Sequence, residues 1–198
     1  MRELINSPSA TNKERMLQKI DLLIGESRRL QAILDEFLDY ARGSKIVKGK
    51  GSIVPVLSGL VELIKPEAEE KSIKVRTSFA PDLPDVEFDE GALKQAFINI
   101  LANALQAMED GGELMVVAAR EPHSVRIDIT DTGPGMPVDM LDRVFNVYFS
   151  TKKTGTGMGL PIARRIIEEH DGGISVVSET GHGTCFSIRL PVGQGAEA

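Results

Sequence analysis

The stretch from Asp89 to about Met108 constrains the fold most, because its side chains divide into two faces of a single helix. Asp89 is a favourable N-cap residue, and the glycines at 111 and 112 end the helix. An apolar stripe at helical spacing consists of Leu93, Ala96, Phe97, Ile100, Ala104 and Met108. Such a stripe must be buried, and neighbouring segments alternate as strands do, so we expect the stripe to face a sheet.

The segments on either side of this helix predict strands and helices without a strict alternation. Strands are expected at Ser52–Val54, Ile73–Phe79, Asp85–Phe88, Glu113–Ala119, Ser124–Thr130, Ile174–Ser178 and Thr184–Leu190. Further helices are expected at Val56–Lys71 and from about Met158 to His170, with a long loop from Asp131 to Gly157. This order favours an α+β protein, a two-layer α/β sandwich in which helices cover one face of a mixed sheet.

The first 45 residues have a different pattern. Thr11 and Glu14 form a capping box, and apolar residues then recur at an alternating spacing of four and three, interrupted once by Ser27. They are Met16, Ile20, Leu23, Leu30, Leu34, Phe37 and Ala41. The pattern is typical of a coiled coil or helical bundle, although a helix packed on its own domain has the same spacing. Residues 43–51 are rich in glycine and lysine, as in a linker. We therefore expect a helical dimerisation segment at 1–45 and a domain at 46–198.

Composition excludes several classes of protein. The net charge of −6 and the lack of a basic stripe argue against a nucleic-acid binder. No apolar run approaches the roughly 20 residues of a membrane span, and the first residues are too polar for a signal peptide. We expect a cytoplasmic chain without membrane contact of its own, which leaves open an anchor elsewhere in the whole protein. Cys185, the only cysteine, is expected to be a buried structural thiol.

Three groups of residues suggest binding chemistry. Asn99 and Asn103 continue a polar line along the edge of the Asp89 helix, where an amide oxygen could hold Mg²⁺ or simply face solvent. Asp131 follows a strand, so its carboxylate could accept a hydrogen bond from an exocyclic amine, or form an ordinary Asx-turn. Gly133 and Gly135 would let a flat ring lie against the backbone.

The third group is the run from Lys152 to Leu160, in which glycines occupy positions 155, 157 and 159 before a helix. Free N–H groups and the partial positive charge of a helix N-terminus favour a bound anion such as phosphate. Lys152 could reach a phosphate, or remain a solvated charge, and the aromatic residues before it could anchor a lid. We interpret the histidines at 123, 170 and 182 as structural, with the charge of His170 suited to a helix C-terminus.

In this order, the motifs resemble the ATP-binding catalytic domain of bacterial two-component sensor histidine kinases. Its fold, the Bergerat ATP-binding fold, is shared with gyrase, Hsp90 and MutL. The matching boxes are residues 99–104, 131–135, 145–149, 155–160 and 181–184, within a resemblance that covers about Ser52 to Pro191. Residues 2–42 are similar to the far end of the dimerisation and histidine-phosphotransfer hairpin, so the 1–45 segment is expected to be part of that hairpin.

The resemblance implies a role for each site residue. Asn103, with Asn99 as a second candidate, would hold a Mg²⁺ ion that bridges the ATP phosphates. Asp131 would bind the adenine amino group with Thr184 near the same ring, and Lys152 would contact phosphate. The implied catalytic residues are Asn103 and Lys152. The implied ATP-binding residues are Asn99, Asn103, Asp131, Gly133, Gly135, Lys152, Gly155, Thr156, Gly157, Met158, Gly159, Leu160 and Thr184.

The implied reaction transfers the ATP γ-phosphate to a histidine, and then to an aspartate on the receiver domain of a response regulator. No histidine precedes His123, so the phosphoacceptor lies outside this chain, as in a truncated protein, or has been lost. We favour truncation, and expect a homodimer through the N-terminal helix with little autophosphorylation by this chain alone. Gln106 and Ala107 stand where many members carry a lysine and a tyrosine, which leaves adenine stacking in doubt, and Lys152 could compensate for the missing lysine.

Two other classes remain as alternatives. ATP-hydrolysing machines of the gyrase or Hsp90 kind place a glutamate where this chain has Asn99, which is a poor general base. A module that uses ATP only as a conformational ligand, or a relative that phosphorylates serine on a protein partner, would share the fold. The dimerisation helix favours the histidine kinase over both.

Overall fold

The computed structural model describes residues 15–27, 30–31, 34, 38, 46–150 and 155–192. The chain divides into two compact units, Met1–Gly43 and Ser44–Ala198, and each is described by itself. In the first unit the described residues are helical, and their large apolar side chains are exposed. Thr11, Glu14, Phe37 and Ala41 lie outside the described residues. The division falls close to the predicted boundary, while the role of the first unit stays a prediction.

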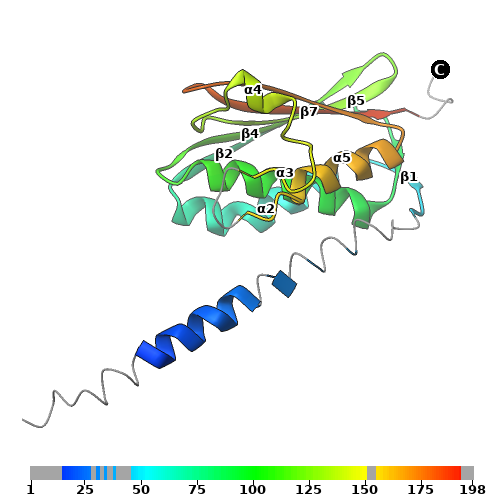
Figure 1. Ribbon diagram of the computed structural model, residues 1–198. Helices are drawn as coiled ribbons and strands as arrows, with labels where there is room; N and C mark the ends of the chain where they lie inside the picture. Colours follow the sequence, from blue (N-terminus) through cyan, green and yellow to red (C-terminus); the bar gives the residue numbers. More distant parts are fainter. Residues whose placement is uncertain are drawn as a thin grey trace, which may run out of the picture. The chain divides into compact units, whose positions relative to one another are not determined.

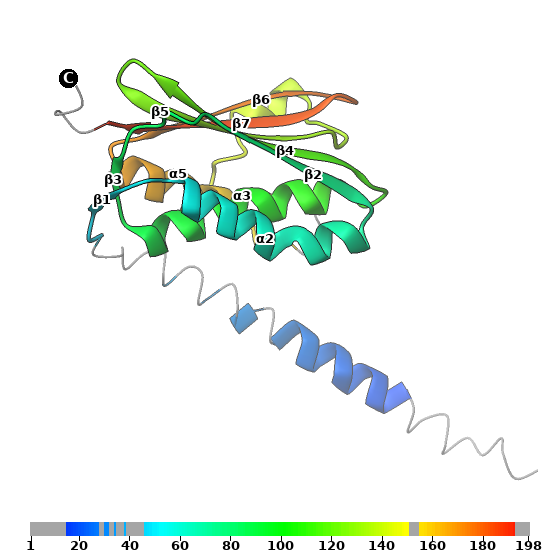
Figure 2. The same ribbon diagram turned by 180° about the vertical axis from the view of Figure 1, so that it is seen from behind.

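The second unit is a two-layer sandwich, as the sequence predicts. Its five-stranded sheet has the order β2-β4-β5-β7-β6, and helices α2, α3 and α5 cover one face of it (Figures 1 and 2). The strands are β2 (Ile73–Phe79), β4 (Gly112–Glu121), β5 (Ser124–Asp131), β6 (Gly173–Glu179) and β7 (Gly183–Pro191). The β2–β4 pair is parallel and the other pairs are antiparallel, so the sheet is mixed.

The helices are α2 (Val54–Glu70), α3 (Glu90–Ala107), the short α4 (Val138–Leu141) and α5 (Gly159–Glu169). Helix α3 packs between α2 and α5, and α4 lies against β6. The predicted stripe of α3 is buried: Leu93, Ala96, Phe97 and Ile100 have no exposed surface. It meets the alternating inward residues of the sheet, of which Leu114, Ile127 and Ile188 are also fully buried. None of the helices among the described residues is long and apolar enough to cross a membrane.

A second, two-stranded sheet differs from the prediction. Strand β1 is Gly49–Gly51, paired antiparallel with β3 (Val86–Phe88). The strand expected at Ser52–Val54 is therefore wrong, because Ile53 is the N-cap of α2 and Val54 its first residue. The last third of the expected linker, residues 49–51, is thus an ordered strand. The residues 49–51 carry no apolar alternation, and their strand form depends on pairing with β3.

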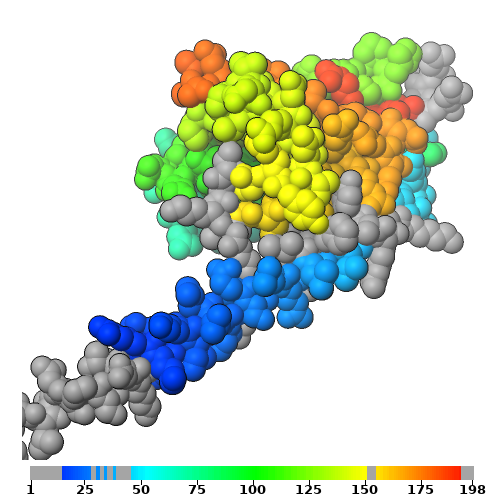
Figure 3. All heavy atoms as spheres, in the orientation of Figure 1, coloured from blue at the N-terminus to red at the C-terminus, as the bar shows by residue number. Residues whose placement is uncertain are grey.

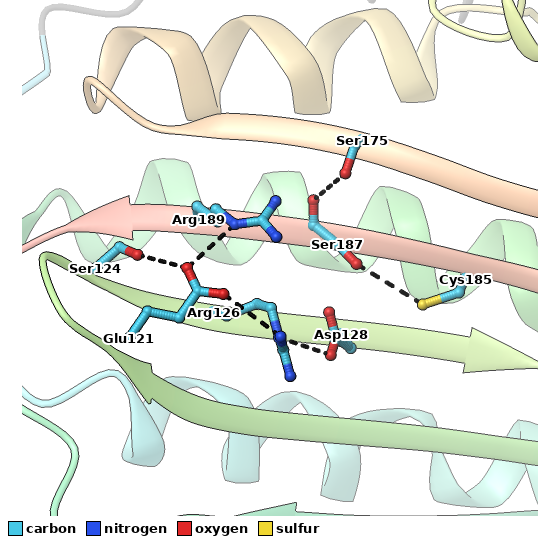
Figure 4. Close-up of polar contacts among 8 residues, drawn as sticks. All are labelled: Glu121, Ser124, Arg126, Asp128, Ser175, Cys185, Ser187 and Arg189. Carbon is cyan, nitrogen blue, oxygen red and sulfur yellow. Dashed lines mark hydrogen bonds and ion pairs between the residues drawn. The ribbon is translucent and has the colours of Figure 1, made fainter.

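The face of the main sheet that is turned away from α3 carries a chain of polar contacts (Figure 4). Glu121 accepts hydrogen bonds from Ser124 (2.9 Å) and Arg189 (3.1 Å), and the hydrogen bond from Ser124 is the main reason that its pKa lies below the ordinary value. Cys185 lies on the same face, half-buried, with its sulfur 3.9 Å from the Ser187 hydroxyl. The expectation of a buried thiol is wrong, because Cys185 alternates with the inward-facing Thr184 and Phe186.

His170 is a structural residue, as expected, but not through its charge. It is buried at the end of α5, its Nδ1 donates to the Ile166 carbonyl (2.6 Å), and its Nε2 accepts the Asp89 backbone N–H (2.9 Å). The ring therefore carries a single proton, on Nδ1. It joins the end of α5 to the start of α3.

The Asp89 carboxylate should make the stability of the protein depend on pH. Its pKa is lowered mainly by the hydrogen bond from the Ala92 N–H, and further by that from Val47. Because this pKa is lowered, the ionised carboxylate stabilises the folded state at pH values above its ordinary pKa of about 4. That stabilisation is lost as the pH falls through the lowered pKa. Asp89→Ser keeps a capping oxygen but cannot titrate, so its free energy of unfolding should fall less steeply below pH 5. The measurement is urea unfolding of both proteins between about pH 6 and 3.

One proton accounts for at most about 1.4 kcal/mol per pH unit, which bounds the difference between the two slopes. Parallel slopes for wild type and Asp89→Ser would show that the carboxylate contributes nothing to acid unfolding.

Candidate functional site

Asp131 forms the floor of the candidate site at the end of β5. Its side chain is buried, and its Oδ1 accepts the backbone N–H of Gly133 at 2.9 Å. In the sheet it pairs with Thr184, the second residue of β7, which is also buried. The two residues that the sequence predicts around an adenine ring are therefore neighbours on adjacent strands.

Ser178 joins three segments beside this pair, and the sequence interpretation missed it. Its hydroxyl donates to the Gly183 carbonyl (2.8 Å), accepts the Met136 N–H (2.8 Å) and lies 2.9 Å from the Thr184 hydroxyl. Since the single Ser178 proton is given to Gly183, the Thr184 hydroxyl donates to Ser178, which fixes its orientation. The available signal was the hairpin, because Ser178 and Thr184 are opposite each other across its two strands.

The glycines near Asp131 allow backbones to approach closely. Gly135 has φ +66°, and a Cβ there would overlap the Glu179 carbonyl of the hairpin. Gly183 has φ +93°, and a Cβ there would overlap the Asp131 carbonyl. A side chain at either position would separate the 131–136 turn from the hairpin. We find a packing role at Gly135 that the sequence interpretation, which considered only a flat ring, did not include.

The amide-bearing edge of α3 lies against two other parts of the site. Ala107 is in contact with the Gly133 turn, since a Cβ at Gly133 would lie 3.3 Å from its side chain and its carbonyl. Asn103 is one helical turn before Ala107, on the same edge. Asn99, one turn earlier, lies beside Gly159, where an added Cβ would be 3.7 Å from the Asn99 Cβ. Both asparagines are half-buried.

The aromatic segment before the glycine run packs on the main body of the unit. Phe145 meets Phe186 edge to face, with 6.2 Å between ring centroids, and the Arg164 guanidinium lies 5.6 Å above the Phe145 ring. The Tyr148 N–H donates to the Gly157 carbonyl at 3.2 Å. In Figure 3 the yellow atoms of this loop lie next to the orange atoms of α5. The aromatic residues thus anchor the loop, and one of them is bonded to the glycine run itself.

The glycine run leads directly into α5. Met158 is fully buried, and its N–H donates to the Thr156 hydroxyl at 3.3 Å. Gly155, Thr156, Gly157, Gly159 and Leu160 are half-buried around it. The first backbone N–H groups of α5 therefore begin beside Asn99, where they can bind an anion. Lys152 lies outside the described residues, together with Thr151, Lys153 and Thr154.

The kinds of side chain in the site determine which metal ion it could bind. Within the part of the chain that the structure describes, no group of three or more His, Cys, Asp or Glu side chains could hold a metal ion. The asparagine amides offer isolated oxygen ligands instead. This suits a Mg²⁺ ion that keeps waters and phosphate oxygens as its other ligands.

The fold and the site define a two-layer α/β protein with a buried carboxylate, two amides and a helix N-terminus around one region. A model of the histidine kinase-, DNA gyrase B- and HSP90-like ATPase family matches residues 88–194. The chain belongs to that family, and its architecture is the one that the sequence predicts.

The chain is similar to several sensor kinases. It is 36% identical over 178 residues to sporulation kinase E of Bacillus subtilis (strain 168), covering 89% of this chain and 24% of that protein. It is 31% identical over 175 residues to sensor histidine kinase ZraS of Escherichia coli (strain K12), covering 88% of this chain and 38% of that protein. The chain thus spans well under half the length of these relatives. Among solved structures, full-length ShkA in complex with AMPPNP superposes with a TM-score of 0.76 at 28% identity, over 88% of this chain and 38% of that one.

Two glycines with positive φ provide a matched test of the close approach in the site. Gly183→Ala would push a Cβ into the Asp131 carbonyl, whereas a Cβ at Gly181, φ +85°, meets nothing within 4 Å. Left-handed backbone alone costs about 1 kcal/mol, so Gly181→Ala should destabilise by about that amount. Gly183→Ala adds overpacking and should cost about 3 kcal/mol in the free energy of unfolding. Equal losses in urea unfolding would contradict the packing role of Gly183.

Proposed function

We propose that this chain contains the ATP-binding catalytic core of a sensor histidine kinase. The observation that carries the proposal is the meeting of Asp131, the amide edge of α3 and the N-terminus of α5. Asp131 suits the amino group of adenine, and the amide edge of α3 suits a Mg²⁺ ion on the triphosphate. The N-terminus of α5 suits the anionic phosphate oxygens. The likeness to sporulation kinase E and to ShkA, which was crystallised with AMPPNP, supports the same reading.

Each residue has a distinct role in this proposal. The Asp131 carboxylate accepts a hydrogen bond from the adenine amino group, and the oriented Thr184 hydroxyl lies beside the same ring. Asn103, with Asn99 as a second ligand, holds Mg²⁺, which neutralises phosphate charge when bound. The N–H groups of Gly155, Gly157 and Gly159 bind phosphate oxygens, and Lys152 adds a positive charge. The remaining residues of the site, Gly133, Gly135, Thr156, Met158 and Leu160, shape its walls.

Phosphoryl transfer fits these groups better than hydrolysis does. Hydrolysis benefits from a side chain that removes a proton from water, and a carboxylate can do so. Asn99 occupies the position of that carboxylate in the hydrolysing branch of the family, and an amide cannot accept a proton in this way. The chain supplies positioning and charge neutralisation, which phosphoryl transfer requires.

The acceptor in this proposal is a histidine outside this chain, and an aspartate of a response regulator receives the phosphate next. His170 cannot serve, because both of its ring nitrogens are engaged inside the protein. Autophosphorylation by this chain alone is therefore expected to be slight. Residues 1–45 would be part of the phosphotransfer hairpin, and residues 46–198 the catalytic domain.

The binding of Mg²⁺-ATP tests the function through a matched pair on one helix edge. Asn103→Ala removes the proposed metal ligand, whereas Gln95→Ala removes an exposed amide two helical turns earlier. Calorimetric titration with a non-hydrolysable ATP analogue and Mg²⁺ should show binding to wild type and to Gln95→Ala with similar affinity. Asn103→Ala should bind at least about 30-fold more weakly, because about 2 kcal/mol is a reasonable value for a lost interaction with a charged partner.

One result would overturn the proposed function, and another would overturn the proposed metal ligand. The first is a wild-type protein that does not bind the analogue. The second is an Asn103→Ala variant that binds with wild-type affinity, which would remove the metal ligand from the proposal.

The first unit should form a homodimer. Met16, Leu22 and Leu23 are about two-thirds exposed (66%, 67% and 67%), and a second copy of the chain would bury these apolar side chains. Leu23→Glu places a charge in that surface and should shift the chain from dimer to monomer in sedimentation-velocity experiments. Leu63→Glu is the control, since Leu63 is an equally exposed leucine (65%) of α2. Dimerisation through the N-terminal helix would be contradicted if Leu23→Glu remained a dimer, or if Leu63→Glu became a monomer.

A further inference from the structure

A cluster of contacts around Asp89 joins the segment 46–51, which we call the strap, to the start of α3 and the end of α5. The Val47 N–H donates to Asp89 Oδ2 at 3.0 Å, and the Ala92 N–H donates to Asp89 Oδ1 at 3.0 Å. A single carboxylate therefore caps α3 with one oxygen and holds the strap with the other. The strap also pairs with β3, whose last residue, Phe88, immediately precedes Asp89.

The same cluster reaches the end of α5. The Asp89 N–H donates to His170 Nε2 at 2.9 Å, so the backbone of the capping residue is fixed as well as its side chain. Next to His170, Asp171 forms an ion pair with Lys48 of the strap, with 2.6 Å between Nζ and Oδ2. The pKa of Asp171 is below its ordinary value, mainly because of the hydrogen bond from Lys48. Two successive residues of the strap, Val47 and Lys48, are thus bonded to the start of α3 and to the second residue after α5.

The two helices that meet in this cluster also carry the candidate site. Helix α3 bears Asn99 ten residues after Asp89, and α5 begins at Gly159, eleven residues before His170. At 1.5 Å per residue the cluster and the site are about 15 Å apart along both helices. Gly159 at the start of α5 lies beside Asn99, and His170 at the end of α5 is bonded to Asp89 at the start of α3, so the two helices run in opposite directions. The strap contacts lie at one end of this helix pair, and the site lies further along it. A shift of either helix at the cluster would change the distance between the amides and the phosphate-binding N–H groups.

We propose that Asp89 is a positioning residue for the nucleotide site, which couples the attachment of the strap to the placement of α3 and α5. This inference rests on the proposed function, since it takes Mg²⁺-ATP as the ligand of the site. Attached, the strap holds both helix ends in the arrangement that binds nucleotide. Detached, it releases one oxygen of the cap and the Lys48 contact, and the affinity falls. The strap continues directly from residues 1–45, so rearrangement of that segment would be transmitted to the site through Asp89.

Coupling of this kind is reciprocal. If strap attachment strengthens nucleotide binding by some factor, nucleotide binding must stabilise strap attachment by the same factor. The N–H of Val47 reports attachment directly, because its hydrogen exchange requires the bond to Asp89 to open.

Asp89→Asn separates the strap from the cap. Asparagine is as good an N-cap as aspartate, and its remaining oxygen can still accept the Ala92 N–H. Its NH₂ group replaces Oδ2 and faces the Val47 N–H, so two donors oppose each other and the strap bond is lost. Lys48→Met removes the second attachment and keeps the apolar stem of the side chain. Lys50→Met is the matched control, because Lys50 is an exposed lysine of the same strap.

The experiment measures the affinity for a non-hydrolysable ATP analogue with Mg²⁺ and, in parallel, thermal unfolding and hydrogen exchange. We expect Asp89→Asn and Lys48→Met to bind about fivefold or more weakly than wild type, with Lys50→Met within about twofold of wild type. Lys48→Arg, which keeps the charge, should restore most of the affinity. In wild type, saturating nucleotide should slow Val47 exchange about fivefold. The unfolding midpoint of Asp89→Asn should fall only by the stabilisation that the charged carboxylate contributes, and the midpoints of the lysine variants should stay close to that of wild type.

The outcomes distinguish this inference from the function on which it rests. A wild-type protein that does not bind the analogue overturns both. Binding by wild type with unchanged affinity in Asp89→Asn and Lys48→Met overturns the coupling alone. Weaker binding in the variants with no effect of nucleotide on Val47 exchange also overturns it, because a general loss of structure would then account for the change.

Discussion

The burial of α3 is the constraint on which the rest of the second unit depends. Leu93, Ala96, Phe97 and Ile100 have no exposed surface, so the rotation of this helix about its axis is fixed by the sheet beneath it. Helices α2 and α5 pack on either side of α3. With its apolar face fixed, the edge that carries Asn99 and Asn103 has only one direction available, along the contact with Gly159 and the Gly133 turn. The geometry of the candidate site therefore follows from hydrophobic packing before any ligand is considered.

The features predicted correctly from the sequence are those that local chemistry determines. Strand β2 has the predicted bounds, and Asp89 caps α3 through the Ala92 N–H as its residue type suggests. The helical layer on a mixed sheet was also predictable, because the 3.6-residue stripe of α3 and the two-residue alternation of the strands require partners. Periodicity also placed Asp131 and Thr184 at strand ends, which is why these two candidates are neighbours in the structure.

The features that could not be predicted depend on partners distant in the chain. Strand β1 is a glycine–lysine sequence without any strand pattern, and it is ordered by its pairing with β3. Ser178 has three partners in the site, and none is within four residues of it in the sequence. The sequence predicts that Gly135 makes room for a flat ring, whereas in the structure Gly135 and Gly183 bring two backbones together. A glycine in a sequence motif shows that a side chain is not tolerated at that position, but not whether a ligand or another part of the backbone fills the space.

Cys185 offers a practical consequence of the alternation along β7. It is the only thiol in the chain, it is half-buried rather than enclosed, and it follows Thr184 on the opposite side of the strand. A fluorophore or spin label attached there would be carried by β7, which is paired with a strand on each side. It would lie one residue along the backbone from Thr184 of the candidate adenine site, yet point away from that site. The wild-type chain therefore already contains a single reporter position, with no need to remove other cysteines or to introduce a new one.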